Sequence, residues 1–183
     1  MKDINELISK DFKNLNYITF FGKESIYSNF HKCEIMYEGH KFYCSEQLFM
    51  YLKAKDYFFN KDIANQIVNL GDVFPLEYKR LGRALPGYDK YGAYWEESKD
   101  EVMYKVISIK FQQNEDMLCE LISEENANAV LVEASPYDKY WGVGLKEGDS
   151  RITNPKDWKG LNRLGFLLMQ LRDNLRKIEE DNE

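Results

Sequence analysis

Glu46 and Lys53 place a carboxylate and an amine on one predicted helix. Ser45 is a good N-cap, and the helical pattern after it runs to about Tyr57. Seven steps of about 100° return to within roughly 20° of the same face, so both side chains could meet one substrate. A carboxylate beside an amine can support proton transfer and covalent attack on carbon. The spacing alone equally fits a solvated Glu–Lys face, which is the commoner case.

A second group of reactive side chains follows the apolar segment 129–133, the best candidate for a buried strand. This strand ends at Glu133, and the loop expected over 135–158 holds Asp138, Trp141 and Gly142. Glycine lets a backbone approach a ligand closely, and a tryptophan can stack on a planar base. Two interpretations are open: the loop binds a ligand, or Trp141 fills the core. Loops of this length are often functional.

Two further segments could hold a phosphate. The sequence GLNRLG at 160–165 opens the last predicted helix, at about 161–177, and backbone N–H groups at a helix start suit a phosphate. Close helix packing at Gly165 is the alternative. Lys79, Arg80 and Arg83 form a small basic cluster, which is either a phosphate site or a solvated face.

The elements that position these residues predict an α+β fold, a mostly helical single domain with a small β-sheet. We expect a short N-terminal helix, a strand over 17–21 and a hairpin over 33–43. The Gly- and Tyr-rich segment 88–94 is expected to be a loop. Further helices are expected over 62–69, 75–85, 95–113 and 116–123. We place an N-terminal helical extension at 1–16, the catalytic domain at 17–177 and an acidic tail at 178–183.

The composition narrows the class of protein. A net charge of −6 over 183 residues argues against broad binding to a polyanion, although a local basic cluster could still hold a nucleotide. Cys33, Cys44 and Cys119 are widely spaced and the histidines are His31 and His40, so we expect neither a disulfide framework nor a metal site. The charged N-terminus and the lack of a long apolar stretch predict a cytoplasmic protein without a membrane partner.

The motifs, taken in order, resemble the NADAR family ("NAD and ADP-ribose"), which includes YbiA-like N-glycosidases. The resemblance runs from Phe20 to Arg172. The family commonly has His where this chain has Gln47, so we expect no proton transfer by that residue. The matching motifs are Phe20-Phe21-Gly22, Ser28-Asn29-Phe30, Ser45-Glu46-Gln47 with Lys53, Leu81-Gly82-Arg83, Trp95, Val102-Met103, Lys110-Phe111, Leu131-Val132-Glu133, Asp138, Trp141-Gly142-Val143-Gly144, Trp158 and Gly160-Leu161-Asn162-Arg163-Leu164-Gly165.

The resemblance implies a YbiA-like fold and cleavage of the bond between ribose C1 and a nitrogen, without a cofactor. The implied substrate is either ADP-ribosylated guanine, in nucleic acid or as a nucleotide, or a phosphoribosylamino-pyrimidine of riboflavin biosynthesis. The implied catalytic residues are Glu46, Lys53 and Asp138, with Lys53 matching a lysine that forms a Schiff base with the opened ribose. The implied substrate contacts are Asn29, Phe30, Arg83, Trp95, Glu133, Trp141, Gly142, Asn162 and Arg163.

Three alternatives stay open at the level of sequence. Two carboxylates could instead cleave the bond by direct displacement through an oxocarbenium-like state, with no role for a lysine nucleophile. The chain could be a non-catalytic module that binds ADP-ribose or an NAD derivative. It could also be a structural or partner-binding protein that has lost catalysis, although intact Glu46, Lys53, Glu133 and Asp138 argue against this.

Overall fold

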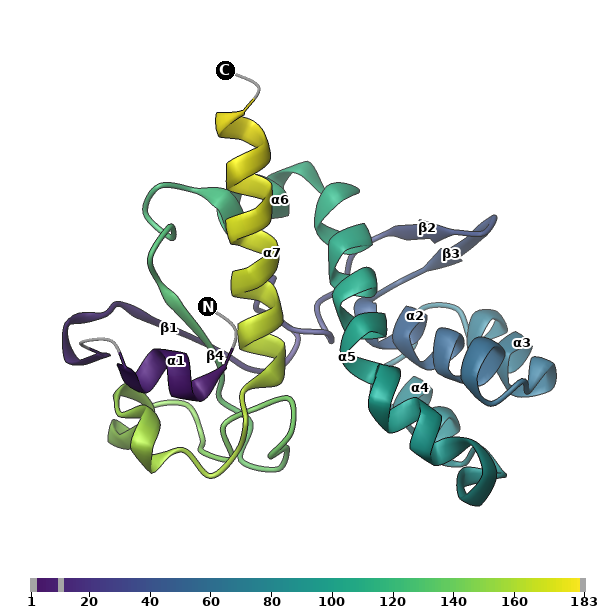
Figure 1. The fold of residues 1–183 in the computed structure, drawn as a ribbon. Coiled ribbons are helices and arrows are strands. Elements are labelled where there is room, and N and C mark those ends of the chain that lie inside the picture. The colour runs from purple at the N-terminus through teal and green to yellow at the C-terminus, as the bar shows by residue number, and fades with distance from the viewer. Residues whose placement is uncertain (1–2, 10–11, 182–183) are drawn as a thin grey trace. The chain divides into compact units, whose positions relative to one another are not determined.

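The computed structural model describes residues 3–9 and 12–181 of the chain (Figure 1). The predicted α+β class is confirmed: helices dominate, and the strands form two small sheets of two strands each. The described residues gather into two compact units. The terminal unit comprises the chain up to Ser28 together with the chain from Asp116 onward, and the central unit is Asn29–Glu115.

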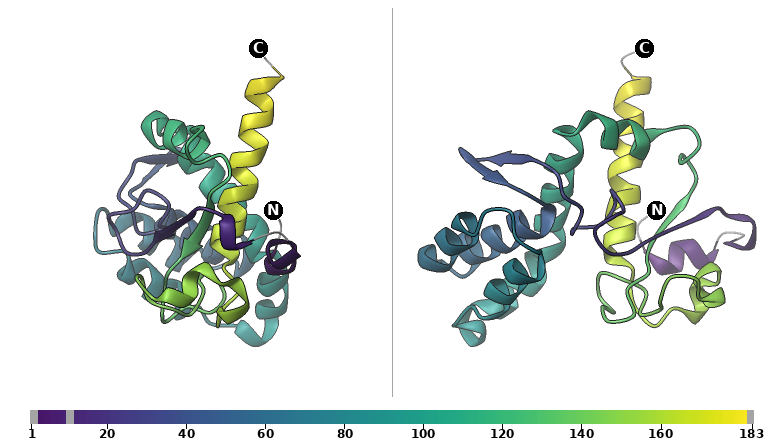
Figure 2. Two further views of the ribbon diagram at one scale, coloured as in Figure 1. Left: turned by 90° about the vertical axis from the view of Figure 1, so that its left-hand side faces the viewer. Right: turned by 180° about the vertical axis from the view of Figure 1, so that it is seen from behind.

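The terminal unit is built on two parallel strands, β1 at Tyr17–Phe20 and β4 at Val130–Glu133. They pair in register, from Tyr17 opposite Val130 to Phe20 opposite Glu133. The first three residues of β4 are buried, as its apolar run predicts. Helix α7, at Arg163–Glu180, packs against β4, and the two lie side by side in Figures 1 and 2. The remaining elements are α1 at Ile4–Ser9, α6 at Glu115–Ile122, and 3-10 turns at Phe12–Asn14, Ser150–Thr153 and Pro155–Asp157.

The central unit is organised around helix α2, at Ser45–Leu52, whose eight residues are all buried. Three helices pack against α2 (Figure 1): α3 at Lys61–Asn69, α4 at Leu76–Arg83 and α5 at Tyr88–Gln112. The predicted hairpin precedes α2, with β2 at Ile35–Tyr37 and β3 at His40–Phe42. Because α2 is enclosed on every face, the polar side chains that it carries are buried as well.

The prediction of a loop over 88–94 is wrong, because α5 already begins at Tyr88. Glycine in a helix costs about 1 kcal/mol relative to alanine, which is why Gly92 favoured a loop. A Cβ at Gly92 would lie 2.6 Å from a ring carbon of Tyr88. The missing side chain therefore lets the Tyr88 ring lie along the helix, and packing outweighs local propensity.

The predicted helix from Ser45 to Tyr57 differs from the structure at both ends. The N-cap is Cys44, with extended backbone, so Ser45 is the first helical residue. The α-helix ends at Leu52 and continues as a π turn over Lys53–Tyr57, in which the Phe58 N–H donates to the Lys53 carbonyl at 3.0 Å. A π turn holds one more residue than an α-helical turn, and such turns are frequent at functional sites.

The described part of the chain contains no helix of the length and apolarity needed to cross a bilayer. Residues 3–9 and 12–181 also contain no group of three or more His, Cys, Asp or Glu side chains placed to hold a metal ion. The predicted extension at 1–16 and tail at 178–183 each lie partly outside the described residues.

Candidate active site

Lys53 is a nearly buried lysine in the central unit, only 8% exposed. Its Nζ donates a hydrogen bond to the carbonyl oxygen of Gly82 at 2.9 Å. The same nitrogen lies 5.3 Å from the ring centroids of Phe58 and Trp95 and 5.9 Å from that of Tyr88. The amine is therefore held by one carbonyl and faced by three aromatic rings, which attract its charged form through cation–π contacts.

Burial lowers the pKa of Lys53, because removal from water disfavours the ammonium form. The surrounding charges act in both directions. Glu96 and, more weakly, Glu46 raise this pKa, whereas Arg83 and Lys99 lower it. Desolvation is the largest influence, so a larger fraction of Lys53 is neutral near pH 7 than for an exposed lysine. A neutral amine is the form that can attack carbon.

Glu96 is the carboxylate with the largest effect on the Lys53 pKa. It accepts a hydrogen bond from the Tyr88 hydroxyl and forms an ion pair with Lys99. Because Glu96 raises the pKa of Lys53, Glu96→Gln should lower it further. If neutral Lys53 is the reactive form, the acidic limb of the pH profile of kcat/KM should shift to lower pH. Glu97→Gln, an exposed position on the same helix, is the control, and an unmoved acidic limb in Glu96→Gln contradicts the prediction.

Glu46 is buried in the first turn of α2, and its backbone N–H donates to the carbonyl of Asn29 at 3.0 Å. Two buried polar atoms flank this contact, Asn29 Oδ1 and Ser45 Oγ, and neither has a hydrogen-bond partner among the described residues. Buried polar atoms in native proteins are normally paired. This part of the central unit is therefore suited to a polar ligand, and Asn29 is one of the predicted substrate contacts.

The predicted basic cluster lines a hollow of about 390 Å³ along α4, formed by Leu76, Lys79, Arg80, Arg83 and Ala84. The Lys79 ammonium also lies 5.9 Å from the ring centroid of Phe30, which contacts Phe74 edge-on. The central unit thus brings the predicted residue Phe30 beside the cluster, and Arg83 links the cluster electrostatically to Lys53. Several cations around one hollow suit a phosphate group.

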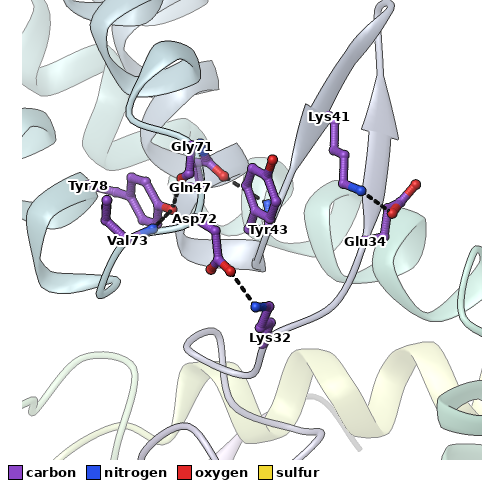
Figure 3. Close-up of polar contacts among 9 residues, drawn as sticks. All are labelled: Lys32, Glu34, Lys41, Tyr43, Gln47, Gly71, Asp72, Val73 and Tyr78. Atoms are coloured by element: carbon purple, nitrogen blue, oxygen red, sulfur yellow. Dashed lines mark hydrogen bonds and ion pairs between the residues drawn. The ribbon is translucent and has the colours of Figure 1, made fainter.

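Gln47, where the resemblance implies a family histidine, has a structural role in the central unit. Its Oε1 accepts from the Tyr43 N–H at 2.8 Å, and its Nε2 donates to the Ile67 carbonyl at 2.9 Å. Figure 3 shows Gln47 directed at Tyr43, and it also shows the Tyr78 hydroxyl, which donates to the Gly71 carbonyl. Both ends of the Gln47 amide are used to join the turn before α2 to α3, so the residue supports α2 from behind its reactive side chains.

In the terminal unit, the loop after β4 is folded by its own polar groups. Asp138 Oδ1 accepts from the N–H groups of Tyr140 and Trp141 at 2.9 and 2.8 Å, an Asx turn. A Cβ at Gly142 would lie 2.8 Å from the Glu133 carbonyl oxygen, so only glycine fits there. This loop brings four predicted residues together: Glu133, Asp138, Trp141 and Gly142.

Asn162 is fully buried at the start of α7, where its backbone is left-handed with a φ of 51°. Its Oδ1 accepts from the Glu133 N–H and its Nδ2 donates to the Leu131 carbonyl, both at 2.9 Å. Both ends of the amide are therefore used by β4, and Asn162 positions the strand instead of offering a group to a substrate. Arg163, the next predicted contact, is half-buried as the first residue of α7.

Gly165 marks the closest approach of α7 to β4. A Cβ there would lie 2.1 Å from the Leu131 carbonyl oxygen and 2.5 Å from the Asn162 amide nitrogen. We expect Gly165→Ala to lower the free energy of unfolding by about 3 kcal/mol or more, because backbone must shift to admit the methyl group. Denaturant unfolding measures this, with Gln170→Ala on the exposed face of α7 as the control. Equal midpoints for the two variants would contradict it.

Three residues around Lys53 lie outside the sequence prediction: Phe58, Tyr88 and Glu96. Phe58 reaches Lys53 because of the π turn, for which the residue pattern gives no signal. Tyr88 and Trp95 are seven residues apart, so a helix that began at Tyr88 would have placed both rings on one face. The expectation of a loop at 88–94 concealed that spacing.

Comparison with known proteins identifies the class. Residues 17–176 match the family model described as the NADAR domain, and the chain belongs to this family. It is 43% identical over 135 residues to the protein irg-1 of Caenorhabditis elegans, covering 74% of this chain and 61% of irg-1. It is 30% identical over 138 residues to N-glycosidase R617 of Acanthamoeba polyphaga mimivirus, covering 70% of this chain and 76% of R617.

A solved structure shares the fold. The NMR structure of the E. coli protein YbiA superimposes with a TM-score of 0.69 at 29% identity, covering 92% of this chain and 89% of YbiA. The name of R617, together with the family match, supports N-glycosidase activity for this class of protein.

Proposed function

We propose that this protein is an N-glycosidase that hydrolyses the bond between ribose C1 and a nitrogen, with Lys53 as its nucleophile. The observation that carries the proposal is the state of Lys53: a buried amine of lowered pKa, held by the Gly82 carbonyl among three aromatic rings. The proposed substrate is ADP-ribosylated guanine, in nucleic acid or as a nucleotide, or a phosphoribosylamino-pyrimidine.

The proposed reaction starts when Glu46 gives a proton to the ring oxygen O4′, the C1–O4′ bond breaks, and C1 forms an iminium with the nitrogen of the base. The neutral Lys53 amine adds to C1, and its proton passes through Glu46 to the nitrogen of the base. The C1–N bond to the base then breaks, which leaves an iminium between C1 and Lys53. Water adds to this carbon while Glu46 accepts its proton. Collapse of the adduct breaks the C1–N bond to Lys53, whose nitrogen takes the proton back from Glu46, and the sugar aldehyde closes to the ring form of ADP-ribose or of ribose phosphate.

The central unit also supplies groups to hold the substrate. Arg83 and Lys79, in the basic hollow on α4, are the proposed phosphate contacts. Trp95 and Phe30 offer ring faces, and the buried Asn29 Oδ1 offers an acceptor. The catalytic role of Asp138, the phosphate contact of Arg163 and the substrate contacts of Glu133, Trp141 and Gly142 stay predictions.

Borohydride trapping tests the nucleophile. Reduction during turnover should convert the iminium into a stable secondary amine, which mass spectrometry of peptides should locate on Lys53. Lys55→Arg is the matched control, since Lys55 lies in the same π turn but pairs with Glu38 at the surface. An active Lys53→Arg variant without any adduct would reject the lysine mechanism and favour direct displacement by carboxylates.

A non-catalytic module that binds ADP-ribose is the competing function, because the basic hollow and the aromatic rings would suit such a ligand equally well. The two functions differ in turnover. Mass spectrometry of released base and sugar, across ribosylated guanine and phosphoribosylamino-pyrimidine, distinguishes them: binding without release in every case would reject the enzyme.

A further inference from the structure

A second hollow in the central unit borders the surroundings of Lys53. It has a volume of about 510 Å³, and its lining includes Phe58, Phe59, Lys61, Asp62, Gly87 and Tyr91. Phe58 belongs to both places, since its ring lines this hollow and also lies 5.3 Å from Lys53 Nζ. The mechanism proposed above gives the hollow no role.

Phe59 has an unusual conformation at this hollow. Its side chain is 65% exposed, and its backbone φ is 52°, in the left-handed region. A bulky residue held there costs of order 1–3 kcal/mol, and such strain persists mainly at ligand and active sites. Here it brings the Phe59 ring to 5.6 Å from the ring of Tyr91, which also contacts Phe58 edge-on at 5.9 Å. The strained backbone therefore places a largely exposed Phe59 ring beside the half-buried Tyr91 ring, with the buried Phe58 ring behind Tyr91.

The π turn at Lys53–Tyr57 positions both Lys53 and the two phenylalanines that follow it, Phe58 and Phe59. The Phe58 N–H donates to the Lys53 carbonyl at 3.0 Å, and the Asn60 N–H donates to the Ala54 carbonyl at 2.8 Å. These bonds hold Phe58 and Phe59 at the end of the π turn that begins with Lys53. A group bound in the hollow would thus be held at a set distance from the reacting carbon.

We propose that this hollow binds the base next to a ribosylated guanine in single-stranded nucleic acid, by stacking on Phe59 and Tyr91. The inference rests on the N-glycosidase function proposed above and selects nucleic acid among its substrates. Aromatic faces accept any base, and a hollow of this size accommodates one base with its sugar. At the rim, the Lys61 cation suits a backbone phosphate and the Asp62 carboxylate can accept from a base amino group.

The charge of the whole chain limits how it could hold a strand. A net charge of −6 disfavours long-range attraction to a polyanion, so affinity for a strand must come from few local contacts. Stacking of one base beside the reacting nucleotide is such a contact. A mononucleotide or a phosphoribosylamino-pyrimidine has no neighbouring base to place in the hollow.

The test compares two substrates that differ only in the neighbouring bases: a short single-stranded DNA with one ADP-ribosylated guanine, and ADP-ribosylated guanosine monophosphate. Phe59→Ala should raise KM for the DNA by about fivefold to a hundredfold, the range measured for loss of one stacked base, and leave KM for the mononucleotide unchanged. Phe59→Tyr should retain the wild-type preference. Met36→Ala, an exposed apolar residue on β2, is the control.

Phe59→Gly separates the ring from the strained backbone. It should lose the preference for DNA as Phe59→Ala does, yet unfold at higher denaturant concentration than Phe59→Ala, because glycine tolerates the positive φ. An equal loss on both substrates, or no loss on either, would overturn the stacking inference. Borohydride trapping with the mononucleotide tests the enzyme function separately. Should neither substrate turn over, fluorescence anisotropy of the modified DNA decides: weaker binding by Phe59→Ala supports the inference, and equal binding overturns it.

Discussion

Lys53→Met should lower kcat/KM by about a thousandfold or more, because it removes the amine that we propose as the nucleophile at ribose C1. The groups nearest to this amine are the Gly82 carbonyl and the rings of Phe58 and Trp95, and none of these three can act as a nucleophile. Methionine keeps the length of the side chain and its packing among the rings. Steady-state kinetics on a ribosylated substrate measures the loss.

The stability of Lys53→Met should not fall as its activity does. An ammonium held among three rings pays a desolvation cost, as its lowered pKa shows, and an apolar side chain of similar length avoids that cost. We therefore expect a free energy of unfolding equal to or above that of the wild type. Lys55→Met, at the exposed position two residues on, should keep its activity. Retention of more than a tenth of the wild-type activity by Lys53→Met contradicts the assignment of Lys53 as nucleophile.

Glu46→Gln should lower kcat by about a hundredfold to ten-thousandfold with little change in KM, since an amide fills the same space but transfers no proton. The backbone contact between Glu46 and Asn29 does not depend on the side chain, so the fold should be kept. Loss of this carboxylate also removes an influence that raises the pKa of Lys53. More of Lys53 would then be neutral, so a fall in kcat cannot be attributed to a shortage of reactive amine.

Two controls make the Glu46 experiment decisive. Glu77→Gln, an exposed carboxylate on α4, should leave kcat unchanged. Near-normal turnover by Glu46→Gln, with circular dichroism matching the wild type, would remove Glu46 from the chemistry and leave proton transfer to another group.

Much of the fold follows from sequence where a pattern is local. The apolar run of β4, the turn at Glu38-Gly39 and the amphipathic pattern of α7 all appear in the structure close to their predicted places. The start of α5 does not, because it depends on Tyr88 filling the space that Gly92 leaves. Helix propensity is assigned to each residue separately, so it does not include the packing of one side chain against another.

The candidate site also contains some residues that the sequence predicts and others that depend on how the helices pack. Resemblance to the family selected Lys53, Trp95 and Arg83, and the central unit places all three in contact or in electrostatic interaction. Tyr88 and Glu96 escaped prediction because the helix phase of α5 decides where they point. Asn162, which the resemblance implies as a substrate contact, is held by β4 at both ends of its amide, and the motif itself gives no sign of that role.

The extra residue in the π turn makes the position of Lys53 independent of the position of Phe58. A regular α-helix through both residues would fix the two positions together. Removal of a single residue from 54–57 would restore a regular α-helix, leave Lys53 seven positions after Glu46, and rotate everything from Phe58 onward by about 100° about the helix axis. The position of Lys53 is set by α2, which precedes the π turn, whereas the position of the Phe58 ring is set by the length of the turn. Insertions and deletions at this one point can therefore change which substrates fit while the reaction itself is retained, which makes the turn a natural place for related enzymes to diverge in specificity.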